Sequence, residues 1–439
     1  MAVLLLLLGL AIPSQLSQSS PNIVLIISDD QAWTDYGFMG HSAIQTPNID
    51  KLAEQSVVFR RGYVPTPLCR PSLTTLATGL YAHQSLITGN DPANTKENQA
   101  HAAKSGKAIR ELLISNVDRH LTLPRALTRQ GYLTFQSGKW WEGSYQRGGF
   151  THGMTRGYPH EGGRHGDDGL TIGRQGLNPI SEFMDLAIAS QKPFFLWYAP
   201  FLPHTPHDPP QRLLQKYQQA GRPRALAAYY AMCEWFDETC GQLLAQLEEK
   251  GVAENTLVIY VTDNGWIQHP NGGYAARSKR SPYEGGTRTP IMFRWPCKLK
   301  AEERPGLCSS IDIAPTILAA AGVAVPKSLP GLNLLPSLLE GSPIERNVIF
   351  GESFAHDIAD IQDPRASLLY RWVIQDQMKL LLTYNGRTGR MKYPPKDRSP
   401  QLFDLKADPH EKVDLASKRP ELLQELSTLI GDWYPARTR

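Results

Sequence analysis

The chain has 439 residues, with 46 Lys and Arg against 42 Asp and Glu, and a formal net charge of +4. A charge this small, without a long basic run, excludes a typical nucleic-acid-binding protein. The length is ample for a large core and predicts either two or three domains or one large α/β domain with an appendage.

The chain begins with a short apolar segment, "MAVLLLLLGLAIPSQLSQSS". The run from Val3 to Ile12 is too short to span a bilayer, which needs roughly 20 residues. It is typical of a signal peptide, predicted over residues 1–20. No later stretch is long and apolar enough to cross a membrane. We therefore expect an exported protein, periplasmic or extracellular, without a transmembrane segment after cleavage.

Strands and helices alternate along the next part of the chain. Apolar, β-branched or aromatic runs predict strands at 22–27, 132–136, 193–199 and 256–262, and helical spacing predicts helices at 46–56, 121–131 and 224–250. The stretch "TPLCRPSLTTLATG" (66–79) predicts a short helix that ends at Gly79 and has Cys69 near its N-terminus. This alternation predicts an α/β fold with a largely parallel sheet and helices on both faces.

Two later regions differ in pattern. Residues 143–176 are rich in Gly, Arg and His and indicate a long irregular loop, which is either a lid or substrate-recognition segment or a flexible surface excursion. After the Pro- and Gly-rich 323–345, short strand-like runs precede a helical C-terminus. We therefore predict a catalytic α/β domain over 21–340 and a small α+β subdomain with an antiparallel sheet over 345–439.

Polar residues follow four of the predicted strands. They are Asp29-Asp30, Lys139, His204 and Asp263-Asn264. In open α/β sheets, ligands bind outside the carboxyl ends of the strands. Any one of these residues alone would be an ordinary turn or capping residue, but four coincidences together predict a shared site.

The chemistry of these side chains favours a hard cation. Three carboxylates and an amide (Asp29, Asp30, Asp263 and Asn264) are ligands for Ca²⁺ or Mg²⁺ rather than for zinc. Lys139, His204 and Lys279 are candidate cationic or proton-donating groups. Together with a metal they would neutralise a tetrahedral oxyanion and its leaving group.

Cys69 is the candidate nucleophile. A plain thiolate, activated by a base such as His204, is one possibility. A soft thiolate nevertheless matches a hard-oxygen metal site poorly, and an oxygen nucleophile would fit better. Among the other four cysteines, Cys233 and Cys240 lie too far apart along one helix to bridge, whereas Cys297 and Cys308 could close a loop.

With these residues in view, the chain resembles a sulfatase of the alkaline-phosphatase superfamily. "PLCRPSLTTLATGLYAHQ" resembles the family signature, Cys-x-Pro-Ser-Arg followed by a helix and Thr-Gly. Further segments fall in the family's order: "NIVLIISDDQ", "GKW" (138–140), "PHTP" (203–206), "VTDNG" (261–265), "KRSPYEGGTRTP" (279–290) and "QLFDLKADPHEKVDLA" (401–416).

The resemblance implies an alkaline phosphatase-like fold and hydrolysis of sulfate esters, in an arylsulfatase-like reaction on a sulfated small molecule or glycan. It implies that a maturation enzyme converts Cys69 to formylglycine, whose gem-diol attacks sulfur on a divalent metal, Ca²⁺ or else Mg²⁺. The implied metal ligands are Asp29, Asp30, Asp263, Asn264 and modified Cys69. Lys139 and Lys279 would hold the sulfate, and His204 would protonate the leaving alcohol or lie beside it.

Two positions depart from the family pattern. Leu73 replaces the signature arginine, which the maturation enzyme reads, and Trp141 replaces a histidine that usually hydrogen-bonds the nucleophile. Arg70 could supply the missing positive charge and bind substrate, and His152 or His160 could supply the missing imidazole. Two alternatives therefore stay open: a phosphodiesterase or phosphonate hydrolase on the same fold, and an inactive homologue that binds sulfated glycans.

Overall fold

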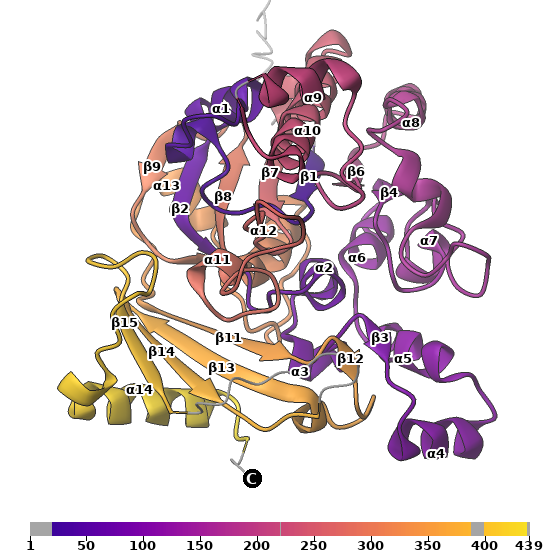
Figure 1. Ribbon diagram of the computed structural model, residues 1–439. Helices are drawn as coiled ribbons and strands as arrows, with labels where there is room; N and C mark the ends of the chain where they lie inside the picture. Colours follow the sequence, from indigo (N-terminus) through magenta and orange to yellow (C-terminus); the bar gives the residue numbers. More distant parts are fainter. Residues whose placement is uncertain (1–19, 220, 388–398, 437–439) are drawn as a thin grey trace, which may run out of the picture.

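The computed structural model describes residues 20–219, 221–387 and 399–436, so the predicted signal peptide lies almost wholly outside the described residues. A nine-stranded sheet forms the centre of the molecule (Figure 1), in the order β10-β2-β8-β7-β1-β6-β4-β5 with β9 beside β2. Its strands are β1 (Asn22–Ser28), β2 (Val57–Tyr63), β4 (Leu133–Gly138), β5 (His152–Gly153), β6 (Phe194–Ala199), β7 (Thr256–Thr262), β8 (Arg288–Arg294), β9 (Glu302–Arg304) and β10 (Cys308–Ser309).

The predicted parallel arrangement is confirmed at the centre of this sheet. β1 pairs in parallel with β6 and β7, and β6 pairs in parallel with β4. β8 is the exception, because it runs antiparallel to both β7 and β2. The sequence analysis did not predict β2 or β8, and their direction depends on contacts between distant segments.

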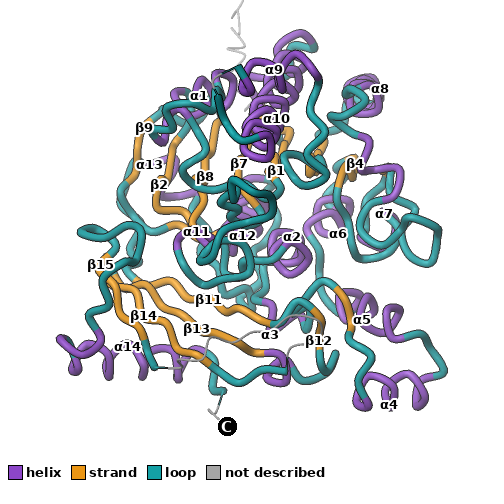
Figure 2. Tube along the Cα trace, viewed as in Figure 1, coloured by secondary structure: helices purple, strands orange, loops and turns teal. Residues whose placement is uncertain are grey.

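Helices cover both faces of the sheet, as Figure 2 shows. One face carries α2 (Cys69–Thr78), α6 (Leu123–Arg129), α12 (Ile313–Ala320) and α13 (Leu335–Glu340), and the other carries α1 (Pro47–Glu54), α8 (Asn178–Ala189) and α10 (Arg224–Glu249). The remaining helices are α3 (Ala82–Ser85), α4 (Lys96–Ser105), α5 (Ile109–Asp118), α7 (Tyr145–Gly148), α9 (Gln211–Gln218), α11 (Glu284–Thr287) and α14 (Pro420–Trp433).

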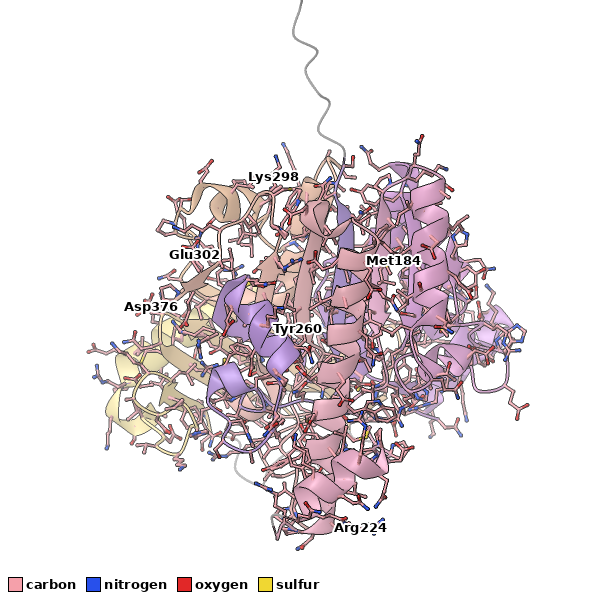
Figure 3. All side chains as sticks on the ribbon, turned by 90° about the horizontal axis from the view of Figure 1, so that it is seen from above. Met184, Arg224, Tyr260, Lys298, Glu302 and Asp376 are labelled. Atoms are coloured by element: carbon pink, nitrogen blue, oxygen red, sulfur yellow. The ribbon has the colours of Figure 1, made fainter. Side chains whose placement is uncertain are left out.

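The central strand β1 is buried on both sides, and its side chains alternate between the two layers. Leu25 packs in the layer with α2 and α6, while Ile26 packs in the layer with α8 and α10. Met184 of α8 and Tyr260 of β7, labelled in Figure 3, belong to the second layer. A continuous apolar strand of this kind is what a doubly covered parallel sheet requires.

A second sheet follows along the chain and has the predicted antiparallel pairing. Its order is β11 (Val348–Phe354), β13 (Leu368–Gln375), β14 (Met378–Thr383) and β15 (Gln401–Asp404), and α14 packs on one face. A short parallel pair joins β12 (Asp357–Ile358) to β3 (Asp91–Pro92), which precedes α4 in the chain. The boundary between the predicted domains at 340–345 stays a prediction.

The cysteine prediction needs a correction. Cys297 and Cys308 do not form a disulfide: Cys297 is exposed, whereas Cys308 is buried in β10 against β2. Cys233 and Cys240 both lie on α10 and are also free thiols. Within the described residues, no helix is long and apolar enough to cross a membrane.

Candidate active site

The predicted strand-end residues converge at one edge of the central sheet. Asp29 directly follows β1, Lys139 follows β4 and Asp263 follows β7, so parallel strands deliver all three to the same edge. Backbone hydrogen bonds fix the edge: the Asp263 amide donates to the Ser28 carbonyl at 2.9 Å. Ligand atoms of Asp29, Asp30, Cys69 and His204 all lie within 4.8 Å of one another.

Cys69 lies at the N-terminus of α2, as the sequence predicted; it is the first residue of the helix and is fully buried. Its sulfur lies 3.9 Å from Asp29 Oδ1 and 3.2 Å from Lys279 Nζ. The N-terminus of a helix carries partial positive charge and unpaired N–H groups, which favour an anion. A nucleophile at residue 69 is therefore held where negative charge is stabilised.

Two buried lysines neutralise the carboxylates. Lys139 Nζ lies 2.8 Å from Asp29 Oδ1, and Lys279 Nζ lies 2.6 Å from Asp30 Oδ2. His204 Nε2 lies 3.3 Å from the same Asp30 oxygen. The His204 Nδ1 nitrogen lies 2.6 Å from the Thr205 carbonyl, which can only accept, so Nδ1 carries a hydrogen.

Burial and charge shift the pKa values of these groups in different directions. Burial raises the pKa of Asp29 to about 7 despite Lys139, whereas Lys279 and His204 overcome burial and lower the pKa of Asp30 to about 2. Burial raises the pKa of the Cys69 thiol to about 12, even though both lysines oppose it. An unmodified thiol in this position therefore stays protonated near neutral pH.

The donor set fits a hard cation. The oxygens Asp263 Oδ2 and Asn264 Oδ1 are buried and have no hydrogen-bond partner. Asp263 Oδ1 accepts from the Asp30 amide at 3.1 Å, and Asn264 Nδ2 donates to Asp30 Oδ1 at 2.7 Å, so these residues are fixed beside the Asp30 carboxylate. Buried unpaired oxygens next to ionised carboxylates are suitable ligands for Ca²⁺ or Mg²⁺.

The structure directs Arg70 away from the role that the sequence predicted. Its guanidinium is fully buried and forms a bidentate pair with Glu142, at 2.8 and 2.7 Å, and also donates to the Asn90 carbonyl at 3.2 Å. This geometry anchors the start of α2 to the segment after β4. Leu73 packs in the apolar layer beneath the sheet and brings no charge to the site.

The imidazole beside Trp141 belongs to His165, which the sequence analysis did not single out. His152 packs against Phe183 of α8, and His160 is exposed. The His165 ring lies 5.2 Å from Trp141 and 5.5 Å from Phe201. The prediction that His152 or His160 fills this position is therefore replaced by His165.

Phe201 connects His165 to the catalytic groups. The Phe201 ring stacks on His204 at 4.3 Å and lies 5.2 Å from Lys139 Nζ. Burial, and next the charge of Lys139, lower the pKa of His165 to about 3. His165 is therefore a neutral imidazole, and its buried Nδ1 has no hydrogen-bond partner.

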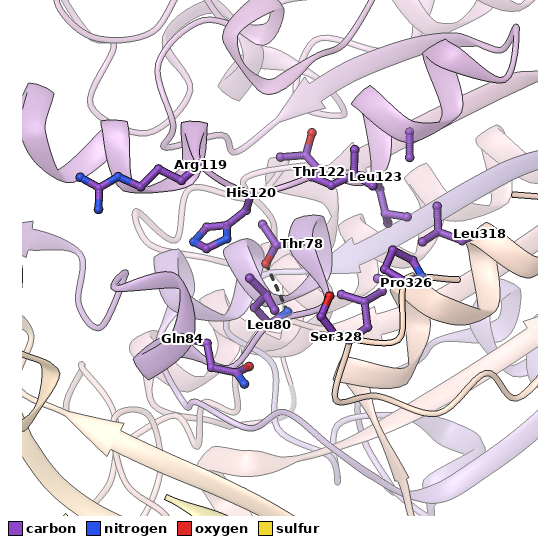
Figure 4. A pocket seen from close by; sticks show the side chains of 14 residues that line it. Thr78, Leu80, Gln84, Arg119, His120, Thr122, Leu123, Leu318, Pro326 and Ser328 are labelled. Carbon is purple, nitrogen blue, oxygen red and sulfur yellow. Dashed lines mark hydrogen bonds between the residues drawn. The ribbon is translucent and has the colours of Figure 1, made fainter. Parts of the chain in front are cut away.

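An apolar cavity of about 330 Å³ lies at the other end of α2 (Figure 4). Thr78 and Leu80 line it on one side and Leu318 and Pro326 on another. Thr78 is nine residues after Cys69, about 13 Å along a helix axis. This cavity contains none of the predicted catalytic side chains, so it is separate from the site.

Comparisons with known proteins agree with this arrangement. The family model described as "Sulfatase" matches residues 21–323, and "N-sulphoglucosamine sulphohydrolase, C-terminal" matches residues 272–430. Human arylsulfatase A is 28% identical over 463 residues, covering 93% of this chain and 87% of its own. Human N-acetylgalactosamine-6-sulfatase is 30% identical over 372 residues, covering 75% and 68%. The structure of Ps i-CgsB in complex with k-i-k-neocarrahexaose superposes with a TM-score of 0.75 at 24% identity, covering 94% and 93%.

Proposed function

The chain belongs to the sulfatase family, has the alkaline phosphatase-like fold and is a sulfuric ester hydrolase; from this premise we propose that it cleaves sulfate esters on a sulfated carbohydrate, using formylglycine made from Cys69 and a bound Ca²⁺. The observation that carries the proposal is the convergence of Cys69, four oxygen-bearing side chains and two lysines at one buried sheet edge.

The chain's own residues have distinct tasks in this reaction. Asp29, Asp30, Asp263 and Asn264 would hold the cation, which supplies positive charge against the oxygens of the ester. The aldehyde at residue 69, once hydrated, supplies a hydroxyl group as nucleophile.

Lys279 Nζ lies 3.2 Å from the Cys69 sulfur, and Lys139 pairs with Asp29, which also contacts that sulfur. Both lysines would bind the sulfate oxygens as the negative charge redistributes. The sulfur–oxygen bond to the alcohol would break as the hydroxyl oxygen at residue 69 bonds to sulfur, and the alcohol oxygen would take up a proton. His204 presents Nε2 toward the site because Nδ1 is engaged by the Thr205 carbonyl. Nε2 is therefore the atom that would carry this proton. The second hydroxyl of the hydrated aldehyde would then lose its proton, so that sulfate leaves and the aldehyde is restored.

The carbohydrate assignment rests on relatives. The names of N-acetylgalactosamine-6-sulfatase and of the neocarrahexaose complex identify sugars as the ligands of those proteins. We propose that the present chain also acts on a sugar. We further propose that it is exported to the periplasm or out of the cell and that a formylglycine-generating enzyme matures it. The apolar start of the sequence and Cys69 support these two steps.

The test compares sulfate release by the wild type and by Cys69→Ala, both produced with the native maturation system. The wild type should release sulfate from an aryl sulfate and from sulfated sugars, and chelation of the cation should abolish release. The Cys69→Ala variant should be inactive under the same conditions. Equal activity in both proteins would refute the proposal, and faster turnover of a matched phosphodiester would favour the phosphodiesterase reading.

A second candidate function applies if Cys69 stays unmodified, namely binding of sulfated glycans without hydrolysis. Leu73 favours it, because the structure buries an apolar side chain where the family has the arginine that the maturation enzyme reads. In that case the unmodified protein would bind a sulfated sugar and release no sulfate.

A further inference from the structure

A group of charged side chains, here called the rim cluster, lies beside the catalytic site and has no part in the mechanism above. It comes from four parts of the chain and consists of Asp91, Arg110, Arg164, His356 and Asp357. Strands β3 and β12 bring its two acidic residues together, because Asp91 pairs with Asp357 in parallel register. Figure 1 shows both strands between α3 and α5.

The rim cluster is ordered by its own contacts yet reaches solvent. Arg164 binds both oxygens of Asp91, with Nε 3.1 Å from Oδ1, and Arg110 Nη2 donates to the same Oδ1 at 2.6 Å. His356 Nδ1 lies 2.7 Å from Asp357 Oδ1. The side chain of Arg164 is 44% exposed, that of His356 29% and that of Asp91 20%.

Asn90 connects this cluster directly to the nucleophile segment. Its Oδ1 accepts from the backbone amide of Arg70, the residue after Cys69, at 3.1 Å. Its Nδ2 lies 3.3 Å from His356 Nε2, and its amide donates to the His356 carbonyl at 3.0 Å. Asn90 therefore links His356 of the rim cluster to the backbone of the residue that follows Cys69.

The buried side chain of Trp141 contacts both Arg70 and Arg164 of the rim cluster. Its ring lies 5.9 Å from the guanidinium carbon of buried Arg70 and 4.7 Å from that of Arg164. A guanidinium stacked on an indole is held in orientation and keeps part of its N–H groups available. Trp141 therefore positions Arg164 at the rim.

The contacts within the cluster decide which chemistry it suits. A metal ion is disfavoured although Asp91, His356 and Asp357 lie within ligand distance of one another, because Arg164 and Arg110 already bind the Asp91 carboxylate. A second sulfate group is disfavoured because the cluster contains two carboxylates, Asp91 and Asp357, whose negative charge would repel it. Hydroxyl groups fit, because carboxylate oxygens keep lone pairs for O–H donors and arginine keeps N–H groups for hydroxyl oxygens.

We propose that the rim cluster binds hydroxyl groups of the sugar that carries the scissile sulfate, with Asp91 accepting from and Arg164 donating to neighbouring hydroxyls. This proposal rests on the proposed function. The rim cluster would be the part of the site that distinguishes a sugar sulfate from a simple aryl sulfate. The loop 143–176, which supplies Arg164, is then a substrate-recognition segment.

The experiment compares kcat/KM for 4-nitrophenyl sulfate, which has no ring hydroxyls, with that for the best substrate in a panel of monosulfated monosaccharides. In Asp91→Asn and Arg164→Ala, the ratio of sugar to aryl turnover should fall about 10- to 100-fold, the usual effect of losing charge-assisted hydrogen bonds. Arg164→Lys should recover part of the ratio. Arg156→Ala is the matched control, because Arg156 is exposed in the same loop and pairs with Asp168.

An unchanged ratio in both variants, with folding verified by circular dichroism, would overturn the proposal. A second calcium ion, bound by the wild type in addition to the one at the catalytic edge and lost in Asp91→Asn, would also overturn the proposal. If the wild type releases no sulfate from any substrate, the proposed function fails, and calorimetry with the monosulfated sugars then tests the cluster alone. Weaker sugar binding by Asp91→Asn would support the cluster's role, and equal binding would refute it.

Discussion

At the residue scale, the site is defined by which buried polar groups have partners and which do not. Lys139 and Lys279 each donate a hydrogen bond to a carboxylate. The buried atoms Asp263 Oδ2, Asn264 Oδ1 and His165 Nδ1, in contrast, have no hydrogen-bond partner. Unpaired buried polar atoms are costly in a stable fold and commonly mark a ligand or a functional group. A cation would explain the two oxygens, whereas His165 contacts Phe201, whose ring lies 5.2 Å from Lys139 Nζ.

His165 should act as a positioning residue that maintains Phe201 and Lys139 beside the sulfate. His165→Ala should lower kcat about 10- to 100-fold with a smaller change in KM, and His165→Asn should recover part of kcat because it restores a polar atom. Steady-state kinetics measure this, with the exposed His160→Ala as control. Equal losses in His165→Ala and His165→Asn would contradict a specific role for the ring nitrogen.

Asp35 should make the stability of the fold depend on pH. Burial raises its pKa to about 7 despite hydrogen bonds from Tyr229 and Ala32, whereas an unfolded Asp titrates near 4. Between these values the unfolded state has lost the proton and the folded state keeps it. The contribution of Asp35 to the free energy of unfolding therefore falls as pH rises from about 4 to about 7.

Asp35→Asn should remove this contribution, so that the variant loses less stability than the wild type over that pH range. Urea unfolding of both proteins across the range measures the difference. Parallel pH profiles would show that Asp35 does not titrate there in the folded protein.

At the element scale, α2 is placed by contacts that the sequence did not reveal. Every residue of α2 is buried, and Arg70 ties its start to Glu142. Removing one partner of a buried ion pair commonly costs about 3–5 kcal/mol. Glu142→Ala should therefore lower the free energy of unfolding by about that amount, as measured by urea denaturation.

The exposed Glu161→Ala is the matched control and should change stability by less than about 0.5 kcal/mol. A second variant, Arg70→Met with Glu142→Leu, should recover part of the lost stability, because no unpaired charge remains. A wild-type value for Glu142→Ala alone would show that the pair is not an anchor.

At the element scale, parts of the fold and of the site were predictable from the sequence and others were not. The central strands β1, β4, β6 and β7 and the polar residues at their ends were predicted, because apolar runs and the parallel-sheet rule are local signals. Glu142, His165 and the rim cluster were not predicted, because their positions depend on how the loop 143–176 and the segment near β12 fold onto α2. Arg70 and His152 show the limit, since a residue near a motif in sequence can face another partner in space.

At the scale of the whole molecule, one buried network joins the two sheets. Lys379 on β14 lies 3.1 Å from Glu284 Oε1 and 3.1 Å from Glu411 Oε1, and the Glu284 amide donates to Glu411 Oε2. Burial raises the pKa of Glu411 to about 7 even though Lys379 opposes it. Glu284 begins α11, which follows the segment that carries Lys279, so this network also supports the catalytic edge.

Lys379→Met should leave two buried carboxylates facing each other and lower the free energy of unfolding by about 3–5 kcal/mol. Sulfatase activity should fall with it, because the Lys279 segment loses its support. Thermal and urea unfolding measure the first effect and steady-state kinetics the second. Lys406→Met changes an exposed lysine and should alter neither; a neutral Lys379→Met would show that the network does not connect the sheets.

The account as a whole depends on the chemical state of residue 69. Mass spectrometry of the peptide that contains Cys69, prepared from protein made in its native source, tests this most directly. The account predicts an aldehyde or its hydrate at residue 69, despite Leu73 four residues later. An unmodified thiol in protein that nevertheless releases sulfate would contradict the mechanism, and an unmodified thiol in inactive protein would identify a binding protein instead.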